Sequence, residues 1–151
     1  IPAAEWGYGG SGKVHVSNAD GEVVWAGYEM DPTGSGTDHA GALQRSTNDG
    51  ETFSSTTTPS WAPGRLAGLN SSHEDANTVY ATFGFFGDPK LIRSRDGGET
   101  WEDLSGFLGR TGTGVISPNG FPDVSTYDVL DFPGSPVIWA ATEIGLVESL
   151  D

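Results

Sequence analysis

One eight-residue stretch occurs twice in this chain and begins a third time. Residues 94–101 read Ser-Arg-Asp-Gly-Gly-Glu-Thr-Trp, and residues 46–53, 48 positions earlier, read Ser-Thr-Asn-Asp-Gly-Glu-Thr-Phe. A third copy starts at Ser149, 55 positions after Ser94, and extends to Asp151. Glycines permit the positive φ of a tight turn, and an Asp side chain accepts hydrogen bonds from the N–H groups of its own turn. The stretch therefore predicts a hairpin turn that recurs once per structural unit.

Two further patterns precede each copy of this stretch. A β-branched, aromatic and alanine pattern occupies residues 23–27, 78–82 and 137–142, and short predicted strands occupy residues 13–17, 65–69 and 125–130. Units of about 50 residues with four short strands are typical of propeller blades. We expect a lead-in (1–12), two blade-like repeats (13–64 and 65–119) and an incomplete third repeat (120–151).

The predicted fold class is all-β, with four-stranded antiparallel blades that form a partial β-propeller. Gly accounts for 23 of the 151 residues, about twice the usual share of roughly 7%, which fits a chain dense in turns. No stretch keeps apolar residues at helical spacing over three turns. A closed propeller usually has about four to eight blades, so three repeats predict only part of one.

Charge and composition exclude several classes of partner. The net charge of −14 argues against binding to nucleic acid or to anionic membrane surfaces. There is no cysteine for disulfides or thiolate metal sites, and no apolar run approaches the ~20 residues of a membrane helix. The chain starts at Ile1 without Met, as expected of a mature product or a fragment.

The repeated stretch resembles the Asp-box, Ser-x-Asp-x-Gly-x-Thr-Trp, of BNR-repeat β-propellers. Residues 120–129 and 138–146 also resemble blade sequences of secreted bacterial sortilin-type propellers. The resemblance implies a bacterial protein that is secreted, extracellular or at the cell surface, with the periplasm as an alternative. It assigns structural rather than catalytic roles to the box residues. These are Ser46, Asn48, Gly50, Thr52, Phe53, Ser94, Asp96, Gly98, Thr100, Trp101, Ser149 and Asp151.

The candidate ligand-binding residues lie in the variable loops and around isolated aromatic side chains. They are Tyr28, Glu29, Asp31, Asp38, His39, Trp61, Phe85 and Phe86. A glycosidase needs two carboxylates, about 5–5.5 Å apart if retaining or 6.5–9.5 Å apart if inverting. Candidates outside the turns are Glu29, Asp31, Asp38, Asp88, Asp123 and Asp128, and the loop from Glu29 to Asp38 is the best single place for a pair. Because 21 of the 151 residues are acidic, such a loop is expected by chance, and no catalytic residue is assigned.

Metal binding has weak support in the sequence. Asp31 and Asp38 flank a glycine-containing loop that could hold Ca²⁺ loosely, without the spacing of a dedicated calcium loop. His15, His39 and His73 are too scattered for a zinc site. We expect no cofactor, with calcium as the open alternative.

The resemblance favours an extracellular or cell-surface binding and scaffold module with a protein or carbohydrate ligand. Remaining blades of the same protein, or other chains of an assembly, would complete its ring. The alternative is a fragment of a propeller glycoside hydrolase, xyloglucanase-like or sialidase-like. A third possibility is an accessory subunit of a large membrane-associated assembly. An Asp-box fold is shared by all these classes, so the fold alone does not decide among them.

Overall fold

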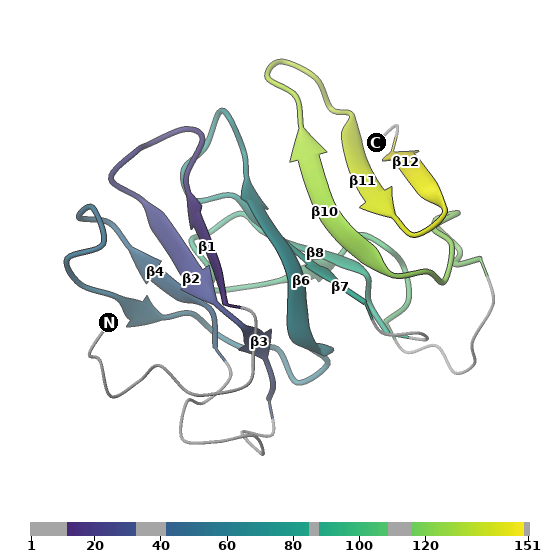
Figure 1. Ribbon diagram of the computed structural model, residues 1–151, viewed down its shortest axis with the longest axis horizontal. Helices are drawn as coiled ribbons and strands as arrows, with labels where there is room; N and C mark the ends of the chain where they lie inside the picture. Colours follow the sequence, from purple (N-terminus) through teal and green to yellow (C-terminus); the bar gives the residue numbers. More distant parts are fainter. Residues whose placement is uncertain (1–11, 33–41, 85–87, 109–115, 150–151) are drawn as a thin grey trace.

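The chain folds as three antiparallel β-sheets that follow one another in sequence order (Figure 1). The computed structural model describes residues 12–32, 42–84, 88–108 and 116–149. Strands are the regular elements of this described part, and none of its segments is a helix that could span a membrane. The predicted all-β class is therefore confirmed.

The first sheet has four strands in the order β1-β2-β4-β5. They are β1 (Lys13–Val16), β2 (Val24–Gly27), β4 (Gln44–Ser46) and β5 (Ser54–Ser55). The tight 46–53 turn joins β4 to β5, as the repeat predicts.

The second sheet has five strands in the order β3-β6-β7-β8-β9. They are β3 (Glu29–Met30), β6 (Gly64–Ser71), β7 (Val79–Phe83), β8 (Leu91–Ser94) and β9 (Glu102–Asp103). All five residues of β7 are buried because the sheet is covered on both of its faces. The 94–101 turn joins β8 to β9.

The third sheet has three strands in the order β10-β11-β12. They are β10 (Thr126–Asp131), β11 (Ile138–Thr142) and β12 (Gly145–Ser149). Ile138, Ala140 and Thr142 are buried on one face of β11, whereas Trp139 and Ala141 on the other face are half-buried.

The three sheets pack face to face, with their first strands side by side. β1 packs along β6, and β6 packs along β10, so these inner strands line a common axis (Figure 1). One core cluster contains residues of the first and second sheets, including Trp25, Leu43, Leu69, Val79 and Ile92. A second cluster joins Tyr80 and Leu91 of the second sheet to Val129 and Ile138 of the third.

The strand count departs from four per sheet in two places, because the second sheet has five strands and the third has three. Glu29, a candidate residue of the variable loops, instead forms β3 together with Met30, and the two residues pair with Arg65 and Gly64 of the second sheet. Met30 is buried in the core between the sheets, and this burial favours an extended segment over a free loop. The second sheet therefore gains a strand from the preceding repeat.

Candidate functional site

The 94–101 turn is held by a network of side-chain bonds to its own backbone. Ser94 Oγ accepts from Gly98 N at 2.8 Å and donates to Asp96 Oδ1 at 2.8 Å. Asp96 Oδ1 also accepts from Thr100 N at 2.9 Å and from Glu99 N at 3.1 Å. The Thr100 hydroxyl bond, followed by the backbone bonds, lowers the pKa of Asp96 to about 2. The Asp96 carboxylate therefore stabilises the turn by accepting hydrogen bonds from Ser94, Glu99 and Thr100.

The 46–53 turn repeats the network with an amide in place of the carboxylate. Gly50 N donates to Ser46 Oγ at 3.0 Å, and Thr52 N donates to Asn48 Oδ1 at 3.0 Å. Asn48 Nδ2 donates to Thr52 Oγ1 at 3.0 Å. The Asn-for-Asp exchange therefore keeps the geometry and removes the charge.

The 94–101 turn also fastens the second repeat onto the first. Trp101 packs against the core between the first two sheets, and its Nε1 donates to the Thr57 carbonyl at 2.9 Å. Thr57 N donates to the Gly98 carbonyl at 2.9 Å. Gly98, at φ 93°, lies so close to Thr56 that a Cβ atom would come within 2.4 Å of Thr56 Cγ2. The turn is a contact between repeats as well as a hairpin.

Polar residues of the inner strands and their turns connect neighbouring sheets. His15 Nε2 lies 2.9 Å from Ser71 Oγ, and the Asn70 amide donates to the Val129 carbonyl. Burial lowers the pKa of His15, an effect that the Asp128 carboxylate opposes. The main role of these groups is to join one sheet to the next.

The turns after the inner strands add further links between sheets. The Asn18 side chain donates to the Asn70 side chain and to the Ser71 carbonyl. His73 Nδ1 lies 2.8 Å from Asp131 Oδ1 in the third sheet. These contacts join residues more than 50 positions apart, so the spacing of His15 and His73 in the sequence does not predict them.

Asp123, one of the candidate carboxylates, forms a buried ion pair with Lys90. Lys90 Nζ lies 2.9 Å from Asp123 Oδ1, and both side chains are fully buried. The Lys90 ammonium also lies 5.2 Å from the centroid of the Phe107 ring. Lys90 directly precedes β8 and Asp123 precedes β10, so the pair ties the second repeat to the third.

The other candidate residues do not form one site in the described part of the chain. Glu29 lies in β3, and Tyr28 accepts a backbone bond from Leu66. Trp61 is partly buried and packs against the first core cluster, and Asp88 is exposed. Asp38, His39, Phe85, Phe86 and Asp151 lie outside the described residues, whereas Asp31 lies within them and Ser149 ends β12.

The described residues contain no group of three or more His, Cys, Asp or Glu that could hold a metal ion. Calcium binding by Asp31 and Asp38 therefore stays a prediction from the sequence.

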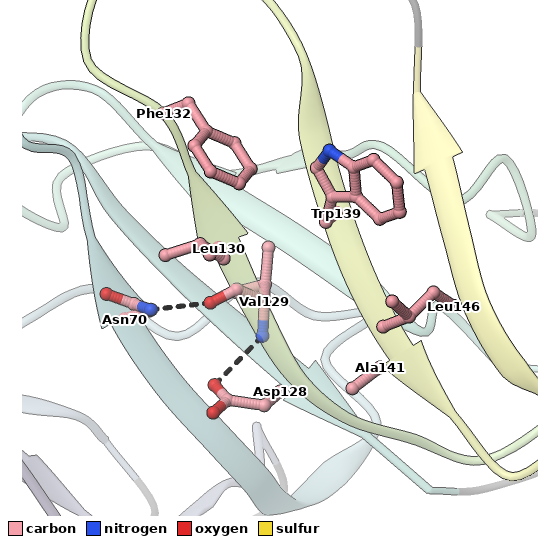
Figure 2. A pocket seen from close by; sticks show the side chains of 8 residues that line it. All are labelled: Asn70, Asp128, Val129, Leu130, Phe132, Trp139, Ala141 and Leu146. Carbon is pink, nitrogen blue, oxygen red and sulfur yellow. Dashed lines mark hydrogen bonds between the residues drawn. The ribbon is translucent and has the colours of Figure 1, made fainter.

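Two grooves lie on the surface of the described residues. The first groove lies on the face of the third sheet that points away from the second sheet (Figure 2). It has a volume of about 440 Å³ and is mostly apolar. Figure 2 shows Trp139, Leu146 and Phe132 around it, with Asn70 and Asp128 at the side of the inner strands. Its lining residues are Asn70, Asp128, Val129, Leu130, Phe132, Trp139, Ala141 and Leu146.

A second groove of about 790 Å³ lies between the outer parts of the second and third sheets. Arg93 and Glu102 line it on one side and Val147 on the other. Glu102 Oε1 lies 2.7 Å from Arg93 Nε and 3.3 Å from Arg95 Nε, so this carboxylate already has two basic partners. Its walls offer charged, amide and apolar groups to an extended ligand.

No protein-family model and no curated protein matches the chain. Solved structures do match it. A GH74 xyloglucanase from Xanthomonas campestris has a TM-score of 0.56 at 22% identity, over 91% of this chain and 22% of its own. YCF48 from Cyanidioschyzon merolae has a TM-score of 0.52 at 17% identity, over 90% of this chain and 32% of its own. A YCF48 bound to a D1 peptide has a TM-score of 0.55 at 14% identity, over 93% of this chain and 41% of its own.

These neighbours are β-propellers, and at such low identity the likeness shows the fold alone. The chain spans less than half the length of each of them. Together with the packing of the three sheets, the comparison shows that this chain has the fold of a partial β-propeller.

Proposed function

We propose that the chain is an extracellular or cell-surface binding and scaffold module built from Asp-box propeller blades. In this proposal it resembles secreted bacterial sortilin-type propellers and works within a larger protein or assembly. The two turns support the Asp-box assignment, because Ser46 and Ser94 accept equivalent bonds from Gly50 and Gly98. The proposed location outside the cytoplasm rests on the sequence resemblance.

The outer edge of the third sheet, which has three strands among the described residues, is the observation that carries the scaffold role. β4 pairs with β5 and β8 with β9, whereas β12 has β11 as its one partner strand among the described residues. The free edge of a strand readily pairs with an added strand, from the same protein or from another chain. We therefore place the first interaction of the module along the outer edge of β12 (Gly145–Ser149).

The second groove lies beside this edge and would receive the side chains of the added strand. Its mixed lining, with Arg93, Glu102 and Asn119 around apolar Phe121 and Val147, suits a protein segment. One of the similar solved structures is YCF48 bound to a D1 peptide. For the present chain we propose a protein ligand in extended conformation.

A synthetic peptide with the sequence of residues 96–105 of this chain tests the strand addition. This peptide supplies the turn residues and β9, which occupy the corresponding outer position in the second sheet. We expect this peptide to shift the amide NMR signals of β12, including that of Val147. A scrambled peptide of the same composition should shift none of them. Shifts confined to residues away from β12 and the second groove would contradict the proposal.

A propeller glycoside hydrolase is the second candidate function. Three acidic residues, Glu102, Asp103 and Glu148, line the second groove. They are the observation that favours a hydrolase, because such an enzyme needs two carboxylates. However, Asp103 accepts bonds from Ser105 and Leu108, and Glu102 is paired with arginines. We expect incubation with xyloglucan to release no new reducing ends, and release that depends on Glu102 or Glu148 would favour the hydrolase instead.

A further inference from the structure

The Ser71 hydroxyl, at the end of β6, has two partners in the first repeat. Asn18 N donates to Ser71 Oγ at 2.9 Å, and His15 Nε2 lies 2.9 Å from the same atom. Ser71 is 0% exposed, and among the described residues no other acceptor lies within bonding distance of its hydroxyl. The contact between β1 and β6, which lie side by side in Figure 1, therefore depends on where one buried proton goes.

Hydrogen-bond chemistry fixes the direction of each bond at this contact. A backbone N–H only donates, so Ser71 Oγ is the acceptor in its bond with Asn18. The hydroxyl keeps one proton of its own, and an unprotonated Nε2 of His15 is the acceptor within its reach. A proton on Nε2 would leave the buried hydroxyl proton without an acceptor, which is costly for a buried polar group. The arrangement thus favours a neutral His15 with its proton on Nδ1.

The surroundings of His15 also favour its neutral form. Burial, the largest effect, lowers the pKa of His15 from 6.5; the Asp128 carboxylate opposes it, and His73 adds to it. Because this pKa is lower in the folded chain than in an unfolded one, the stabilisation by His15 is complete above about pH 6.5. It is lost as the pH falls through the lowered value.

The equivalent contact between the second and third sheets has a different acceptor. Asn18 and His73 hold corresponding positions, since the residue before each donates to the carbonyl that precedes the next strand. His73 N donates to Asp131 Oδ1 at 3.3 Å, and His73 Nδ1 lies 2.8 Å from the same oxygen. A carboxylate accepts from a histidine N–H whether the ring is neutral or protonated. This second contact therefore persists when the first is lost.

Few titratable groups surround His15. β2, which pairs with β1, carries none. Asp128 and His73 act on His15 with opposite signs, and Asp128 is exposed, so solvent and salt screen its effect. Burial and the bond to Ser71 therefore decide the charge of His15. The titratable side chains on β1, β6 and β10 besides His15 are Lys13, Arg65, Tyr127, Asp128 and Asp131, and His73 follows β6.

We propose that the contact between the first and second sheets is a pH-sensitive joint, closed while His15 is neutral and open when His15 is protonated. In the closed state the Ser71 hydroxyl donates to His15 and accepts from Asn18, so β1 and the turn after it stay bonded to β6. Protonation weakens both bonds together, because they share Ser71 Oγ. The joint goes beyond the binding role proposed above and involves neither β12 nor the second groove, so the outcome of the peptide experiment does not affect it.

NMR of the ring nitrogens in the whole, ¹⁵N-labelled chain tests the bond directions. At pH 8 we expect the His15 ring to carry its proton on Nδ1 and none on Nε2. As the pH falls, this ring should titrate with a midpoint below 6.5. A proton on Nε2 at pH 8, or a midpoint at or above 6.5, would overturn the proposal.

The backbone amide signal of Asn18 shows whether the charge of His15 opens the joint. We expect this signal to move between pH 8 and pH 5 with the same midpoint as the His15 ring. The Leu66 amide is the internal control, because it donates to the Tyr28 carbonyl at 2.9 Å and so also links the first repeat to β6. It lies five positions before Ser71 on β6 and should not follow that midpoint. A constant Asn18 signal while His15 titrates would contradict the joint.

Urea denaturation at pH 7.5 and pH 5.5 measures the effect on stability. We expect the unfolding equilibrium constant of the wild-type chain to rise several-fold on going to pH 5.5. His15→Gln should remove most of this rise, because glutamine does not titrate in this range. His73→Gln is the matched control and should leave the rise in place, since the His73 bond to Asp131 does not need a neutral ring. Equal rises in wild type and His15→Gln would overturn the proposal.

Discussion

A Cβ atom at Gly68 would lie 2.3 Å from the carbonyl oxygen of Tyr127, across the contact between the second and third sheets. It would also lie 2.8 Å from the Thr82 hydroxyl oxygen. Gly68 falls at the irregularity in the pairing of β6 with β7, and Tyr127 falls at the one between β10 and β11. The two inner strands can approach this closely because the residue at 68 has no side chain.

Gly68→Ala should therefore loosen the contact between β6 and β10. The clash is with backbone, which cannot rotate away, so we expect a loss of about 1–3 kcal/mol in the free energy of unfolding. Urea denaturation monitored by tryptophan fluorescence measures this loss. Gly21→Ala is the matched control, because a Cβ atom there meets nothing within 4 Å; equal effects of the two substitutions would contradict the close approach.

The two turn serines should have nearly equal effects on stability. Ser46 and Ser94 are both buried, and each hydroxyl accepts from a glycine N–H that loses its partner in an alanine variant. We expect Ser46→Ala and Ser94→Ala each to cost about 1–3 kcal/mol, as for a buried unsatisfied group. Ser60→Ala, at an exposed position, should cost much less, and chemical denaturation of all three variants checks the comparison.

The 94–101 turn should weaken in acid, whereas the 46–53 turn should not. The pKa of Asp96 is lowered to about 2 from 3.8, so its stabilising effect is complete above about pH 4 and is lost as the pH falls toward 2. Asp96→Asn should remove this dependence, since Asn48 already serves the other turn without a charge. Melting temperatures between pH 2 and 5 would show it, and identical profiles for wild type and Asp96→Asn would be evidence against the assignment.

Breaking the Lys90–Asp123 pair from one side should be costly. Lys90→Met leaves a fully buried carboxylate facing an apolar group, and such losses are typically about 3–5 kcal/mol. The Lys90→Met/Asp123→Leu double variant should lose less than the sum of the two single variants. A double-mutant cycle by guanidinium denaturation measures the coupling, and additive single effects would show that the two groups do not depend on each other.

The sequence predicts the local structure of this chain well because that structure depends on near neighbours. Turn residues such as Ser94 and Asp96 bond within four positions, so their spacing alone indicates the hairpin. The aromatic pattern likewise predicts β2, β7 and β11, since alternation along a strand decides which residues face the core.

Contacts between repeats could not be predicted in the same way. β3 joins the second sheet because Met30 is buried there, and Lys90 meets Asp123 from 33 positions away. Such pairs depend on how the sheets are arranged in space, for which a single sequence has no periodic signal. The candidate ligand loops also remain predictions, because Asp38, His39, Phe85 and Phe86 lie outside the described residues.

NMR distance measurements between β6 and β10 test whether the second and third sheets pack face to face. The Asn70 side-chain amide donates to the Val129 carbonyl, so its protons lie near the β10 backbone. We predict nuclear Overhauser effects from the Asn70 amide protons to Val129 and Leu130, together with effects between Leu91 and Val129. Effects confined to each separate sheet, with none between β6 and β10, would contradict the account.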